Sequence, residues 1–158
     1  ELRESFERPF VIGYRFSPEE YENPGIRMED TLFLVDELAD KDLDYLHISL
    51  NDLERVSQSK DYQEKSILEY VHEKIAGRLA FVSVGGIKRQ KDLKKAMEHS
   101  ELAAVGRALI TEPHWVNKVF NNREDQLRLT MSLEDFQELE IARSMSPFLF
   151  AMMADQIQ

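Results

Sequence analysis

Two glycine turns, one of which ends in an arginine, are the residues best suited to hold an anion. Gly85 and Gly86 follow a short apolar run, and Gly106 and Arg107 follow the next run along the chain. A glycine pair permits a tight turn and lets backbone N–H groups approach a ligand oxygen, because no Cβ is in the way. A guanidinium can hold phosphate with two parallel hydrogen bonds. Either turn alone is more often a plain turn, but together they predict a phosphate cradle.

Arg15 and Ser49 occupy two further positions of the same kind. Arg15 directly follows an apolar run, where a charge must find a partner or face a cavity. Ser49 follows the second apolar run. A helix that begins near Arg89 would add its partial positive end to the first glycine turn. These positions widen the candidate site from a phosphate cradle to a larger ligand site.

The elements that position these residues are four units in which a strand is followed by a helix. Strands are predicted at 10–14, 43–48, 79–84 and 102–105, and helices over 28–39, over 67–75 with a stop at Gly77, around 93–97, around 109 and over 115–120. Strands that are apolar throughout are covered on both faces, which is typical of parallel sheets with helical crossovers. The class is therefore α/β, and all the candidate residues lie at the carboxyl edge of the sheet.

The pattern changes near residue 120. We expect two parts, a sheet unit over residues 1–120 and a helical C-terminal extension over residues 121–158. Ser132 and Asp135 resemble a capping box, and Leu133 begins an apolar helical spacing that predicts a helix. The apolar patch at 148–153 is interpreted as buried contact surface, against the sheet unit or a partner.

The remaining polar residues favour structural roles. His47 has no acidic partner at triad-like positions, so we interpret it as a packing or cavity-lining histidine. Glu19 and Glu20 are interpreted as solvated or capping charges rather than paired catalytic carboxylates. Metal-ligand spacing is absent from the other three histidines, which we expect at the surface: His72, His99 and His114.

Composition excludes several classes of function. The 158 residues carry a net charge of −10, which argues against non-specific nucleic-acid binding because phosphates demand a basic face. The absence of cysteine excludes disulfides, thiolate metal sites and a cysteine nucleophile. No apolar run approaches the roughly 20 residues that span a bilayer. No signal peptide is visible, and the missing initiator Met suggests a piece of something longer. We expect a cytoplasmic protein without a metal.

Four strings of the sequence carry a resemblance to a known family. They read VIGYRFSPEE at 11–20, DYLHIS at 44–49, VSVGGI at 82–87 and AVGRALITEP at 104–113. In order and spacing they resemble the second half of the old yellow enzyme family of NAD(P)H-dependent FMN oxidoreductases. That family is a TIM (β/α)8 barrel, so the resemblance implies half of a barrel, strands five to eight.

The resemblance also implies roles for the candidate residues. Arg15 would contact the pyrimidine side of the flavin and stabilise negative charge on the reduced ring. Gly85, Gly86, Gly106 and Arg107 would hold the FMN phosphate. NAD(P)H would supply the hydride, and a small-molecule acceptor such as an electron-poor alkene would receive it.

The substrate-binding residues of the family come from the first half of the barrel, and no matching motif is present here. We therefore expect no catalytic residue in this chain, which resembles a C-terminal fragment that is inactive alone. Its open sheet edges predict self-association or pairing with the missing N-terminal half. Two alternatives stay open: the phosphate-binding half of another TIM-barrel enzyme, and a non-catalytic acidic interaction module.

Overall fold

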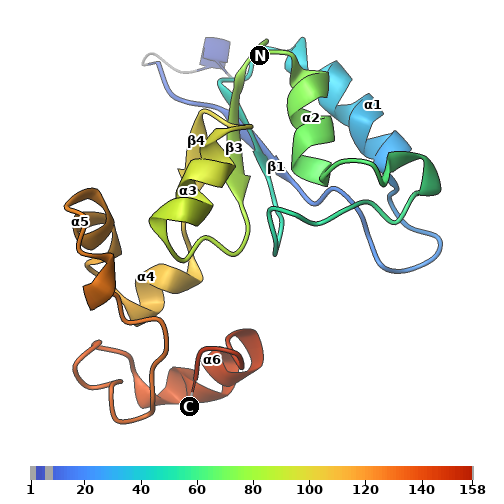
Figure 1. Ribbon diagram of the computed structural model, residues 1–158. Coiled ribbons are helices and arrows are strands. Elements are labelled where there is room, and N and C mark those ends of the chain that lie inside the picture. The colour runs from blue at the N-terminus through green and yellow to red at the C-terminus, as the bar shows by residue number, and fades with distance from the viewer. Residues whose placement is uncertain (1–2, 6–8, 158) are drawn as a thin grey trace. The chain divides into compact units, whose positions relative to one another are not determined.

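The computed structural model describes residues 3–5 and 9–157, and Figure 1 labels its main elements. The strands are β1 (Gly13–Phe16), β2 (Tyr45–Ile48), β3 (Ala80–Val84) and β4 (Leu102–Ala104). The α-helices are α1 (Met28–Ala39), α2 (Ile67–Ile75), α3 (Gln90–Met97), α4 (Arg107–Thr111), α5 (Trp115–Phe120) and α6 (Ser146–Met152). Short 3-10 helices lie at Arg3–Ser5, Lys60–Tyr62, Glu124–Gln126 and Arg143–Met145.

The sheet has four strands in the order β1-β2-β3-β4, and every neighbouring pair is parallel. Because the strand order follows the sequence, each strand is joined to the next by a crossover, and helices lie in these connections. The predicted α/β class is confirmed. Four consecutive parallel strand-and-helix units constitute half of a (β/α)8 barrel, as predicted.

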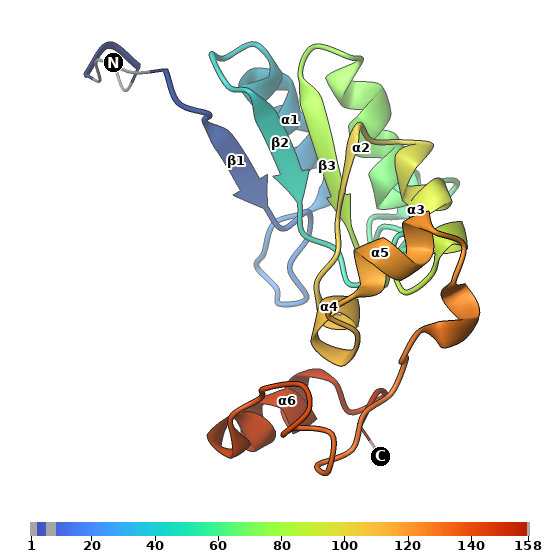
Figure 2. The same cartoon turned by 90° about the vertical axis from the view of Figure 1, so that its left-hand side faces the viewer.

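The two faces of the sheet differ in burial. Leu46, Ile48 and Phe81 lie on one face and are almost completely buried. Helices α1 and α2 lie side by side on one side of the sheet, and their buried residues include Val35 and Val71 (Figures 1 and 2). Because successive strand residues point to opposite faces, the other face carries Arg15, His47 and their neighbours.

The first strand lies later in the sequence than predicted. It begins at Gly13 rather than Phe10, and Arg15 lies inside it rather than at its end. Ile12 makes two hydrogen bonds with Asp44. Its N–H donates to the carboxylate oxygen Asp44 Oδ2 at 2.7 Å, and its carbonyl oxygen accepts the Asp44 N–H at 2.8 Å. The carboxylate takes the place of a ladder acceptor, so regular pairing starts one residue later.

The glycine expected to end α2 does not occupy the cap. Ala76 takes the C-cap position in the left-handed conformation, with φ of 52°, and its N–H donates to His72 O at 3.1 Å. Gly77 follows with φ of 71°. Two successive residues with positive φ therefore reverse the chain, and glycine occupies the second of them.

The chain divides into two compact units, which are described separately. The first contains residues 1–85 and 94–104, with the whole sheet, and the second contains residues 86–93 and 105–158. In the second unit four buried residues form a core cluster: Met131, Phe136, Leu149 and Met153. The boundary predicted at residue 120 stays a prediction.

The helix predicted from Leu133 is wrong. Asp135 does accept the Ser132 N–H at 2.7 Å, as a capping box requires, but the segment continues as turns. Glu140 has a φ of 55°, and the Ile141 N–H donates to Phe136 O at 2.8 Å. The left-handed conformation of Glu140 is incompatible with a helix. The residues with apolar helical spacing therefore form a compact loop that packs around buried Phe136.

The apolar patch at 148–153 lies in helix α6 and its C-cap residue Met153, and it is only partly buried. Leu149 and Met153 enter the core cluster, whereas Phe148 is 58% exposed. Within the part of the chain that the structure describes, no helix is long and apolar enough to cross a membrane.

Candidate functional site

The first glycine turn follows β3, and its backbone requires glycine at Gly85 and favours glycine at Gly86. Gly85 has a φ of 150°, and a Cβ on it would lie 2.9 Å from the backbone carbon of Asp52. Gly86 has a φ of 64° and is exposed. The backbone of the loop after β2 therefore approaches the turn too closely for any side chain at Gly85.

The second glycine turn follows β4 and differs from the first. Gly106 is exposed and has a φ of −113°, so its backbone does not require glycine. A Cβ built on it meets no atom within 4 Å. The absence of a side chain at Gly106 therefore leaves open space in front of the backbone, next to Arg107 at the start of α4.

The two turns leave the sheet at one edge. Val84 and Ala104, the last residues of β3 and β4, are partners in the parallel register. The side chains that follow them reach a common point, because Lys88 Nζ lies 3.1 Å from Asp155 Oδ2 and Arg107 Nη1 lies 3.6 Å from Asp155 Oδ1. Sequence reasoning missed Lys88, although its place two residues after the glycine pair was a usable signal.

The backbone N–H groups at the start of α3 are less available to an anion than predicted. Asp92 Oδ2 accepts the N–H groups of Lys88 and Arg89 at 3.0 and 2.9 Å, and Glu124 accepts that of Gln90. These amides already have carboxylate acceptors within the chain. A phosphate at this edge would have to use the glycine turns and the two cations instead.

Arg15 lies in the first unit, on the face of the sheet turned away from α1 and α2. Its Nη2 donates to Ser49 Oγ at 2.7 Å, so two of the predicted residues lie together. The partner of Arg15 in the parallel register is His47, whose Nε2 is buried without a hydrogen bond in the described residues. Burial, together with the positive charge of Arg15, lowers the pKa of His47. His47 is therefore a neutral histidine that lines this face.

The predicted site residues are divided between the two units. Gly86, Gly106 and Arg107 belong to the second unit, whereas Arg15 and Gly85 belong to the first. That all five face one ligand stays a prediction. Among the described residues, no group of three or more side chains could hold a metal ion.

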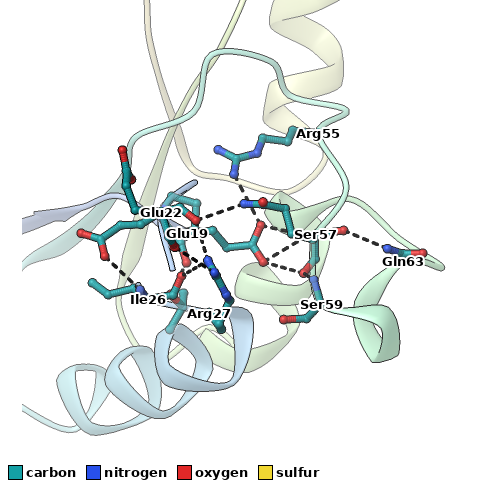
Figure 3. Close-up of polar contacts among 12 residues, drawn as sticks. Glu19, Glu22, Ile26, Arg27, Arg55, Ser57, Ser59 and Gln63 are labelled. Atoms are coloured by element: carbon teal, nitrogen blue, oxygen red, sulfur yellow. Dashed lines mark hydrogen bonds and ion pairs between the residues drawn. The ribbon is translucent and has the colours of Figure 1, made fainter. Parts of the chain in front are cut away.

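Glu19 was interpreted as a solvated or capping charge, and that interpretation is wrong. Glu19 is only 4% exposed, and its carboxylate lies in the hydrogen-bond network drawn in Figure 3. Ser57 Oγ donates to it at 2.6 Å, the Gln58 N–H donates at 3.1 and 3.2 Å, and Arg55 Nη2 lies at 3.4 Å. The neighbouring Glu20 is exposed, as predicted, and accepts the Ile26 N–H at 3.0 Å within the same loop.

The Glu19 network ties the loop after β1 to the loop after β2. Arg27 closes the first loop on itself, because its guanidinium donates to Glu20 O at 2.6 Å and Glu22 O at 2.8 Å (Figure 3). The two loops directly follow the strands that carry Arg15 and His47. Buried charge pairing thus joins the two loops that follow the carboxyl ends of β1 and β2.

Comparison with known proteins assigns the family. The model of the NADH:flavin oxidoreductase / NADH oxidase family matches residues 3–126, and the chain belongs to that family. The chain is 35% identical over 133 residues to the probable NADH-dependent flavin oxidoreductase YqiG of Bacillus subtilis, which covers 84% of this chain. It is 42% identical over 117 residues, 72% of the chain, to the NADH:acrylate oxidoreductase of Vibrio harveyi. The NADH:fumarate oxidoreductase of Klebsiella pneumoniae is 36% identical over 122 residues, or 75% of the chain.

The chain spans a minor share of each of these relatives. The match covers 36% of YqiG, 12% of the acrylate oxidoreductase and 13% of the fumarate oxidoreductase. The family assignment confirms the resemblance found in the sequence.

Proposed function

We propose that this chain forms the second half of the barrel in an NADH-dependent flavin oxidoreductase and carries the binding site for the FMN phosphate. The observation that carries the proposal is the pair of glycine turns after neighbouring parallel strands, with Arg107 at the second turn. Its support is the family match over both turns.

The chemistry of the donor set fits a phosphate. Lys88 and Arg107 already converge on one carboxylate group, which shows that both side chains can reach a single anion. The open space at Gly106 and the left-handed turn at Gly86 allow backbone N–H groups to approach ligand oxygens. The anchor in this proposal consists of Gly85, Gly86, Gly106 and Arg107.

Arg15 has the second role in the proposal. Its guanidinium would face the pyrimidine side of the flavin and stabilise negative charge there, with Ser49 holding the guanidinium in place. The chemistry that FMN supplies when bound is hydride transfer from NADH to an acceptor. Two relatives are named for acrylate and fumarate, which are both electron-poor alkenes. We propose an acceptor of that class, bound by residues outside this chain.

The test is the visible absorption spectrum of the purified full-length protein. We expect the bands of a flavin, and we expect Arg107→Ala to weaken FMN binding about tenfold or more because a charge-assisted pair with phosphate is lost. A barrel enzyme for a sugar phosphate would bind its ligand without these bands. Protein that neither contains nor takes up flavin would overturn the proposal.

A further inference from the structure

Asp155 lies between two cations that belong to the proposed phosphate site. Its Oδ2 accepts a hydrogen bond from Lys88 at 3.1 Å, and its Oδ1 lies 3.6 Å from Arg107 Nη1. The three residues come from the turn after β3, the start of α4 and the tail after α6, all within the second unit. One carboxylate therefore joins three segments that are distant in the sequence.

From this geometry, and building on the proposed function, we infer that Lys88 is a second cationic ligand of the phosphate and that Asp155 competes with the phosphate for both cations. A carboxylate and a phosphate recognise the same donors, a guanidinium and an ammonium. The phosphate carries more charge and more acceptor oxygens than a carboxylate, so it binds the two cations more strongly than Asp155 does.

The cluster is open to solvent, as an exchange of anions requires. The side chains of Lys88, Arg107 and Asp155 are 38%, 34% and 55% exposed. The two cations lower the pKa of Asp155, Lys88 more than Arg107, so the carboxylate is ionised at neutral pH.

The backbone beside Asp155 is fixed by packing rather than by these charges. Gln156 is 2% exposed, and its carbonyl oxygen accepts the Met131 N–H at 2.8 Å. Met153 is fully buried in the core cluster of the second unit. A phosphate would therefore displace only the side chain of Asp155, while the tail stays in place.

The turn that carries Lys88 is held in a similar way. Trp115 Nε1 donates to the backbone oxygen of Lys88 at 2.8 Å, and Trp115 is 2% exposed. A buried aromatic ring thus sets the position of the lysine backbone, and only the flexible side chain must turn from a carboxylate to a phosphate.

The experiment compares FMN with riboflavin, which lacks the phosphate, in fluorescence titrations of the full-length protein. We expect Asp155→Asn to tighten FMN binding about two- to fivefold, the range of an exposed ion pair. We expect Lys88→Gln to weaken it about tenfold and Lys88→Arg to restore it. Riboflavin affinity should be unchanged in all three variants.

Asp36→Asn is the matched control, because Asp36 also pairs with two cations, Lys74 at 2.8 Å and Arg78 at 2.7 Å, but lies in the first unit. It should leave FMN affinity unchanged. If Arg107→Ala weakens FMN binding while the Asp155 and Lys88 variants do not change it, the inference fails and the proposed function stands. If the wild-type protein binds FMN no better than riboflavin, both fail.

Discussion

Replacing Glu19 by alanine is the sharpest test of how the carboxyl edge of the sheet is held. The side chain of Glu19 is 0% exposed, and that of its partner Arg55 is 16% exposed. The substitution removes the common acceptor of Ser57 Oγ, the Gln58 N–H and Arg55. Each of these donors loses its partner, and Ser57 has little access to water because it is 2% exposed.

The expected loss is about 3–5 kcal/mol in the free energy of unfolding, which is the usual cost of removing one partner from a buried ion pair. Glu19→Gln keeps the size and one acceptor oxygen but not the charge, so we expect a smaller loss of about 1–2 kcal/mol. A loss of 3–5 kcal/mol is a large part of the roughly 5–15 kcal/mol by which domains are stable.

The assay is urea unfolding followed by circular dichroism at neutral pH. Glu22→Ala is the matched control, because Glu22 lies in the same loop but its side chain is exposed, and its effect should stay within about 0.5 kcal/mol. A Glu19→Ala protein within about 1 kcal/mol of wild type would refute the conclusion that this buried carboxylate joins the two loops.

Two further predictions concern pH. Burial raises the pKa of Glu112, but hydrogen bonds from Lys118 and from the Arg128 and His114 amides outweigh it and hold the pKa below 4.5. The stabilisation is therefore present above about pH 4.5 and lost as the pH falls through the folded pKa. Glu112→Gln should unfold at lower urea than wild type at pH 7, with a smaller difference at pH 3.5; equal differences at both values would contradict this. The lowered pKa of His47 predicts an NMR titration midpoint below 6.5, which Arg15→Gln should raise. Because the unfolded chain takes up the proton first, stability should fall as the pH drops below about 6.5, and a midpoint at or above 6.5 would contradict the burial of His47.

The fold was predictable because the apolar residues of each segment follow the period of its element. Helix α2 has the predicted bounds, since Val71 and Ile75 repeat at helical spacing on one buried face. The sheet is parallel as predicted, and in its central strand β3 the consecutive apolar residues Phe81 and Val82 are both buried, which requires cover on both faces. The loop around Phe136 has the same apolar spacing as a helix, and only its packing distinguishes the two.

The candidate site was predictable only in part. Glycines after strands are visible in the sequence, and the conformation of Gly85 and Gly86 agrees with the tight turn expected there. Glu19 was missed because its burial depends on Ser57 and Arg55, which lie in a different loop. Asp155 was missed because its pairing with Lys88 joins segments 67 positions apart. Contacts between distant segments leave no local period in a sequence.

The most direct test of the central claim is a crystal structure of the full-length protein with FMN. We predict the phosphate within hydrogen-bonding distance of the Arg107 guanidinium and of backbone N–H groups at Gly86 and Gly106, with Arg15 against the pyrimidine side of the ring. An FMN phosphate bound away from both glycine turns would contradict the account.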